Sequence, residues 1–301
     1  MAPYLSSTRR GVDVTARGNL PEPKWLRLMI VFMPLRSAAI GLALLGGLLA
    51  TAVPAPAQAP DTVLLEELTW TEVRDALRAG KTTVIVPAGG TEQNGPHMAL
   101  GKHNARVKVL SERIARALGD ALVAPVIAYV PEGAIAPPTG HMRFPGTITT
   151  PEDAFEKVLE SAARSFKAHG FRHIVLLGDH GSTQAGQKAV AARLNREWAA
   201  GPARVLAVEE YYHASEIEAA QLFRSRGYRD AELGRHAGLT DTALTLATAP
   251  ALVRTDRLRP GREGDGVDGD PTRATAELGR AGVDLIVSRT VDAIRKSIPS
   301  R

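Results

Sequence analysis

Residues 82–86 read Thr-Thr-Val-Ile-Val, a run of mostly β-branched side chains that is typical of a buried β-strand. A polar loop containing two adjacent glycines follows at 89–97, and apolar residues then recur at helical spacing over 104–118. Strand, polar loop and helix in this order form the repeating unit of α/β proteins. This stretch therefore decides the fold class.

The same alternation continues along the chain. Strands are predicted at 121–130, 173–177 and 205–208, and further helices at 71–79, 151–169, 184–198, 215–226, 240–249 and 283–298. Thr150 is the predicted N-cap of the helix that follows it, with Pro151 in the first helical position. We expect a mostly parallel sheet with helices on both faces, formed by a single domain over residues 60–301.

The first 59 residues have the pattern of a secretory signal peptide. An uncharged segment of 16 residues, 38–53, follows Arg36 and leads to an Ala-x-Ala sequence that ends at Ala59. It is shorter than the roughly 20 residues that span a bilayer, so we expect cleavage near Ala59 rather than a stable membrane anchor. The mature protein is then exported, to the periplasm or beyond. A start at Met33 gives a more ordinary signal length, and residues 1–32 are then an over-extended reading frame.

Charge and composition exclude several classes of protein. The net charge of +5 comes mostly from residues 1–59, and the rest of the chain holds 31 basic and 30 acidic side chains. A nucleic-acid-binding domain usually carries a basic surplus, so we expect no nucleic-acid partner. The chain has no cysteine, which excludes thiolate catalysis, disulfides and cysteine-based zinc sites.

Potential metal ligands gather in loops that follow the predicted strands. In parallel sheets, ligands bind beyond the carboxyl ends of the strands. The sequences are Gly89-Gly90-Thr91-Glu92-Gln93-Asn94-Gly95-Pro96-His97, Lys102-His103-Asn104, Thr139-Gly140-His141, Gly178-Asp179-His180-Gly181-Ser182-Thr183, and His236-Ala237-Gly238 with Asp241 beyond it.

These loops resemble the creatininase (creatinine amidohydrolase) family. The family signature G-x-x-E-Q-H-G-x-H-L-P-x-x-x-D is similar to 89–103, and its F-P-G-T, N-G-H-G-G-N-like and H-A-G-x-x-E-T segments are similar to 144–147, 178–183 and 236–242. The resemblance implies a three-layer α/β/α fold, a metal centre, hydrolysis of C–N amide bonds and a homo-oligomer, which in this family is often a hexamer.

Three departures from the family pattern change the expected metal centre. His103 stands at the position of the Asp that bridges two metals, and Asn94 and Ser182 replace ligands of the second metal. A neutral imidazole has one lone pair and cannot bridge two cations. We therefore predict one divalent metal per chain, held by Glu92, His103 and His180, with zinc favoured and manganese or iron also compatible. Alternatively, His103 helps to cap or pack the following helix.

The resemblance assigns roles to the remaining polar residues of these loops. His236 is the candidate for proton transfer, and Asp241 orients either His236 or the substrate nitrogen. Asp179 is expected to hydrogen-bond a ligand histidine or to join the ligands itself. His97, His141 and Asn94 are expected to bind substrate or support the ligands, although Asn94 is equally compatible with a simple Asn-Gly turn.

Two functions from different classes follow. The first is a metal-dependent hydrolase that cleaves a C–N amide bond of a small cyclic or linear amide by metal-activated water. The alternative is a non-catalytic periplasmic protein that binds a small molecule and has kept the fold but lost the metal chemistry. Glu92 and His180 favour the enzyme, because a degenerating site more often loses such residues as well.

Overall fold

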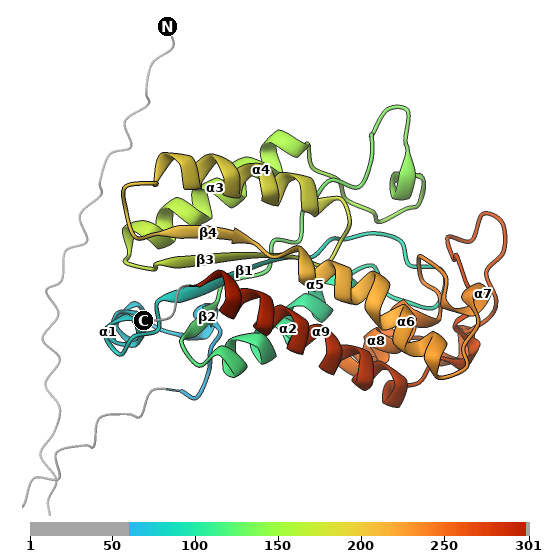
Figure 1. Cartoon of the computed structure of the whole chain (residues 1–301). Coiled ribbons are helices and arrows are strands. Elements are labelled where there is room, and N and C mark those ends of the chain that lie inside the picture. The colour runs from blue at the N-terminus through green and yellow to red at the C-terminus, as the bar shows by residue number, and fades with distance from the viewer. Residues whose placement is uncertain (1–59, 299–301) are drawn as a thin grey trace, which may run out of the picture. The chain divides into compact units, whose positions relative to one another are not determined.

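Four parallel strands form the central sheet of the computed structural model, which describes residues 60–298 (Figure 1). Their order is β2-β1-β3-β4. The bounds are β1 (Thr83–Ala88), β2 (Ala121–Val123), β3 (His173–Gly178) and β4 (Arg204–Ala207). The chain leaves β1 for one neighbouring strand and later returns to the other side of β1. The winding direction therefore changes beyond the carboxyl ends of β1 and β3, where ligands bind in such sheets.

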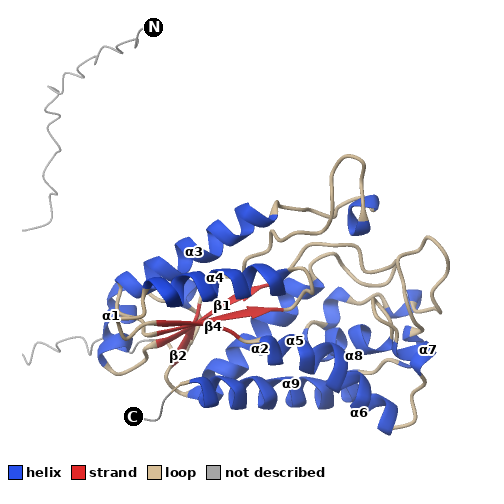
Figure 2. Ribbon diagram, turned by 45° about the horizontal axis from the view of Figure 1, so that its top comes forward, coloured by secondary structure: helices blue, strands red, loops and turns tan. Residues whose placement is uncertain are grey.

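Helices cover both faces of this sheet (Figure 2). On β1, Ile85 packs into one hydrophobic core, whereas its neighbours Val84 and Val86 pack into the other. The first core is completed by α2 (Lys102–Leu118), α5 (Glu209–His213), α8 (Leu239–Thr248) and α9 (Ala276–Ser297), and the second by α3 (Glu152–Ala168) and α4 (Thr183–Glu197). This arrangement confirms the three-layer α/β/α fold.

The remaining α-helices of the described residues are α1 (Trp70–Arg78), α6 (Ala219–Ser225) and α7 (Asp230–Leu233), and short 3-10 helices occur in the connecting loops. A π-helical turn, Ala214–Glu218, joins α5 to α6. Within residues 60–298, no helix combines the length and apolar character needed to cross a membrane. The predicted signal peptide lies outside the described residues and stays a prediction.

The structure corrects two local predictions. The strand expected at 121–130 ends at Val123, because Pro125 has no N–H for a sheet hydrogen bond, and only an isolated bridge at Ile127 continues the pairing. Thr150 is not the N-cap of α3. Pro151 takes that position, and the N–H of Thr150 instead donates to the carbonyl of Val130.

The two helices α8 and α9 pack almost backbone to backbone. A Cβ atom added at Gly279 would lie 1.8 Å from the carbonyl oxygen of Ala243. Glycine normally weakens a helix by about 1 kcal/mol relative to alanine. Here the close approach of the two helix backbones requires it.

The change Gly279→Ala should therefore destabilise the protein by roughly 1–3 kcal/mol, the usual cost of overpacking, despite the better helix propensity of alanine. Urea unfolding followed by circular dichroism measures the change. Gly201→Ala is the matched control, because its Cβ would lie 3.6 Å from the nearest atom, the carbonyl oxygen of Trp198. A Gly279→Ala protein as stable as the control would contradict the packing argument.

Candidate metal centre

Glu92 lies at the middle of the candidate site and is fully buried. It follows β1 in the chain. Its Oε1 atom is 2.8 Å from Nε2 of His103, at the start of α2, and its Oε2 atom is 3.1 Å from Nε2 of His180, which follows β3. Nε2 of His141 is 3.0 Å from the same Oε2 atom. The fold therefore brings the three predicted ligands Glu92, His103 and His180 to one place.

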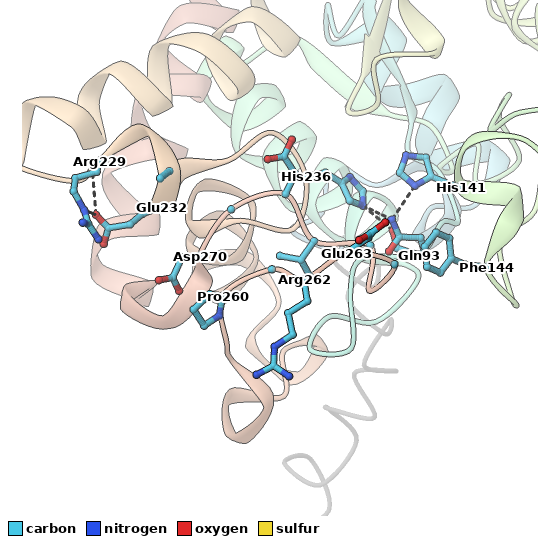
Figure 3. A pocket seen from close by; sticks show the side chains of 17 residues that line it. Gln93, His141, Phe144, Arg229, Glu232, His236, Pro260, Arg262, Glu263 and Asp270 are labelled. Atoms are coloured by element: carbon cyan, nitrogen blue, oxygen red, sulfur yellow. Dashed lines mark hydrogen bonds and ion pairs between the residues drawn. The ribbon is translucent and has the colours of Figure 1, made fainter.

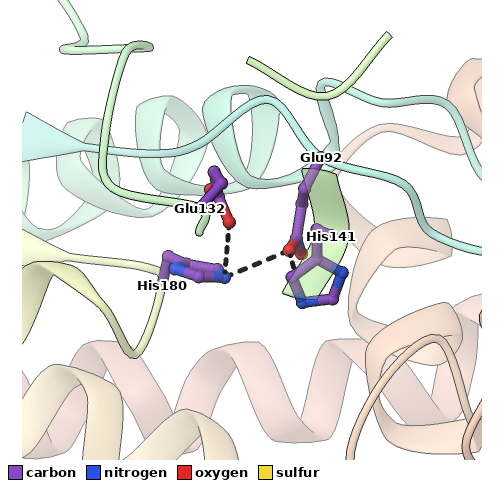
Figure 4. Close-up of side chains that lie close together, drawn as sticks. All are labelled: Glu92, Glu132, His141 and His180. Carbon is purple, nitrogen blue, oxygen red and sulfur yellow. Dashed lines mark hydrogen bonds and ion pairs between the residues drawn. The ribbon is translucent and has the colours of Figure 1, made fainter. Parts of the chain in front are cut away.

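A second acidic side chain, Glu132, joins this site, although its sequence context did not single it out. Glu132 lies in the loop between β2 and α3, and its Oε2 atom is 3.3 Å from Nε2 of His180. Glu92, Glu132, His141 and His180 each place one potential ligand atom within 4.8 Å of the others (Figure 4). His103 is outside this group of four, on the other oxygen of Glu92.

The donor set fits a divalent cation. Neither carboxylate oxygen of Glu132 has a hydrogen-bond partner, although the residue is only 4% exposed. Burial, together with the nearby charge of Glu92, raises the pKa of Glu132 to about 8. Burial opposes ionisation of Glu92 as well, but hydrogen bonds from His103 and His180 hold its pKa well below the usual value. A cation among these residues would satisfy both carboxylates.

Asp179 fixes His103 from the side opposite Glu92. Its Oδ2 atom is 2.6 Å from Nδ1 of His103, while Arg106 and the hydroxyl of Tyr211 donate to the same carboxylate. Burial would raise the pKa of Asp179, but the charge of Arg106 and the hydrogen bond with His103 lower it below its ordinary value. A carboxylate held against one nitrogen of a histidine orients the other nitrogen, as is common around metal ligands.

Asp241, in the first turn of α8, accepts hydrogen bonds from two buried cations. Nζ of Lys102 is 2.5 Å from Oδ2, and Nη1 of Arg106 is 2.8 Å from Oδ1. Oδ2 also accepts the N–H of Ala237, at 2.9 Å. Asp241 therefore fixes the backbone next to His236, and no hydrogen bond joins the two side chains among the described contacts.

His236 faces an open pocket of about 850 Å³ that also contains His141, one of the candidate metal ligands (Figure 3). Its Nε2 atom is 2.9 Å from the carbonyl oxygen of Gln93, and its Nδ1 atom is 3.8 Å from Oε1 of Glu92. Burial and the charge of Lys102 lower the pKa of His236 to about 4, so the ring is neutral at pH 7. Gln93, His141 and Phe144 line the same end of the pocket, and Arg229 and Glu232 line the far end.

Two other predicted residues face away from this pocket. The side-chain amide of Asn94 donates to the carbonyl oxygens of Glu92, at 2.9 Å, and Ala99, at 3.2 Å, so it holds the turn that carries Glu92. His97 is fully buried, with Nε2 3.1 Å from the hydroxyl of Thr242. Asn94 therefore stabilises the turn that carries Glu92. His97 connects this loop to α8 through its contact with Thr242.

These observations define the class of protein as a three-layer α/β/α protein with a candidate metal centre at the carboxyl ends of its strands. The chain belongs to the creatininase family: the family model described as creatinine amidohydrolase matches residues 66–294.

Curated relatives include proteins of more than one specificity. The chain is 29% identical over 227 residues to the mycofactocin precursor peptide peptidase of Mycolicibacterium smegmatis, covering 72% of this chain and 86% of that protein. It is 25% identical to the creatinine amidohydrolase of Pseudomonas putida, covering 79% and 98%. A crystal structure of creatininase aligns with a TM-score of 0.67 at 23% identity, covering 80% of this chain and all of that one.

The buried charges around Arg106 yield a stability prediction. Arg106→Met leaves Asp179 and Asp241 without their shared cation, and breaking a buried pair in this way costs about 3–5 kcal/mol. The matched control is Arg113→Met on the same helix, whose ion pair with Asp284 is exposed and is worth at most about 1 kcal/mol. Urea unfolding of both variants provides the comparison. Equal losses would show that the buried network does not stabilise the fold.

Proposed function

We propose that this protein is a metal-dependent hydrolase that cleaves a C–N amide bond of a small molecule. The observation that carries the proposal is the convergence of Glu92 and His180 with further ligand atoms beside an open pocket. A divalent metal bound there would polarise the substrate carbonyl and lower the pKa of a bound water to about 7.

The residues of the chain supply the remaining steps of this reaction. The neutral ring of His236 has a nitrogen lone pair that can take up a proton and pass it to the departing nitrogen. Gln93 holds His236 at the mouth of the metal centre, and Asp241 fixes the adjacent backbone. His236 is therefore the proposed proton-transfer residue, and Asp241 is a positioning residue.

The substrate is proposed only by class. The names of the relatives indicate creatinine in one case and a precursor peptide in another, so the family accepts both small and extended amides. A pocket of about 850 Å³ lies within the range of roughly 300–1,000 Å³ that suits drug-sized ligands. This volume supports a cyclic or linear amide with substituents beyond the reacting bond. The oligomeric state stays a prediction, with a homo-oligomer expected.

Loss of turnover in two ligand variants tests the proposed function. Glu92→Gln and His180→Asn should each lower kcat/KM at least about 100-fold, because even residues that only support metal ligands usually contribute 10–100-fold. The assay is hydrolysis of a panel of lactams, linear amides and short peptides, followed by mass spectrometry. His213→Asn, at an exposed position, serves as the control. Ligand variants that match the control would reject the proposal, as would binding of amides without any turnover.

Metal content tests the number of cations independently of activity. Protein purified without chelator should contain one divalent metal per chain by inductively coupled plasma mass spectrometry. Asn94 is used in a turn, and Ser182 lies 2.7 Å from Nδ1 of His180, so neither supplies a charged ligand for a second cation. Two tightly held metals per chain would contradict this prediction.

A further inference from the structure

Glu132 is the buried group in the described structure whose position is hardest to explain without a ligand. It is 4% exposed, and neither carboxylate oxygen has a hydrogen-bond partner; Nε2 of His180 lies 3.3 Å from Oε2. A buried carboxyl group without a hydrogen bond is costly in either protonation state. The native structure must therefore gain something from this side chain that hydrogen bonds within the protein do not provide.

The surrounding loops are shaped to hold Glu132 in this position. Its backbone N–H donates to the hydroxyl of Thr149 at 2.9 Å, and the same hydroxyl donates to the carbonyl of Gly133 at 3.0 Å. Across the site, a Cβ atom at Gly90 would lie 2.8 Å from Oε1 of Glu132. The absence of a side chain at position 90 thus leaves room for the carboxylate.

The carboxylates of Glu132 and Glu92 approach the same nitrogen atom of His180. Nε2 of His180 lies 3.3 Å from Glu132 and 3.1 Å from Glu92, so two carboxylates converge on one nitrogen that carries at most one proton (Figure 4). The buried ammonium of Lys102 bonds Asp241, at 2.5 Å, and lies farther from Glu92, 3.9 Å from Oε1. A divalent cation in place of that proton would give both carboxylates and the imidazole a common partner.

We propose that Glu132 is a ligand of the metal, together with Glu92 and His180, and supplies the carboxylate missing at position 103. This inference rests on the proposed metal-dependent function. Two carboxylates and an imidazole suit Zn²⁺ and also Mn²⁺ or Fe²⁺. His103, held between Glu92 and Asp179, then acts as a positioning residue for Glu92.

The test compares metal binding and stability of Glu132→Gln with those of the unsubstituted protein, using zinc alone as the ligand. Competition with a chromogenic chelator measures the zinc affinity, and the visible spectrum of the cobalt-substituted protein reports the ligands. Glu132→Gln should weaken zinc binding by at least about 10-fold and alter the cobalt spectrum. The metal-free variant should melt at or above the temperature of the metal-free parent, because the neutral amide cannot place a second negative charge beside Glu92.

Two further variants make the result decisive. Glu132→Asp keeps the carboxylate but shortens the side chain by one methylene group, so the carboxylate lies farther from His180. This variant should also change the cobalt spectrum. Glu216→Gln alters a half-buried carboxyl group outside the cluster and should leave zinc binding unchanged. If Glu132→Gln and Glu132→Asp bind zinc and cobalt like the parent while Glu92→Gln does not, Glu132 is no ligand and the proposed function stands. If the parent itself binds no metal, the proposed function fails as well.

Discussion

The structure depends on a continuous chain of buried charges that joins the sheet to the pocket. It runs from Glu92 through His103 to Asp179, then through Arg106 to Asp241 and Lys102. Three carboxylates face the two basic side chains Arg106 and Lys102 along this chain, and Glu132 adds a fourth acidic group near Glu92. Such a cluster is stable only if its charges balance. The acidic groups are concentrated beside Glu92, where a metal would be held. The same residues would therefore affect both the stability of the fold and the binding of a metal.

Much of the fold could be predicted from local sequence. The β-branched run that became β1 and the apolar spacing that became α2 are strong signals, and both elements lie within a few residues of their predicted positions. The strand after Ala121 was predicted too long, because its apolar residues suggested pairing that Pro125 interrupts. Pro125 is itself a local signal, since a proline cannot donate a sheet hydrogen bond, so the sequence did contain the information that ends this strand.

The site was predicted in part, through motifs rather than through geometry. Glu92, His103 and His180 lie close together, as the resemblance to the family implied, but their proposed roles still await experiment. Glu132 was missed because nothing in the sequence around it distinguishes a buried acid from a surface acid. Glu132 lies in the loop after β2, the edge strand next to β1. That position indicates closeness to Glu92 only once the order of the strands is known. Likewise, the contact of His97 with Thr242 joins segments far apart in the chain.

The two ends of the pocket are formed by different segments of the chain. Its inner end is made by loops that follow the strands, whereas its outer wall is largely the segment 260–270, which lies between α8 and α9. Arg262 and Glu263 on this wall are exposed and belong to none of the buried charge contacts. Under the proposed function, the segment that would contact the outer part of a substrate is separate from the residues that would carry the reaction. Exchange of residues 260–270 would then alter the fit of the substrate and leave the candidate metal centre in place.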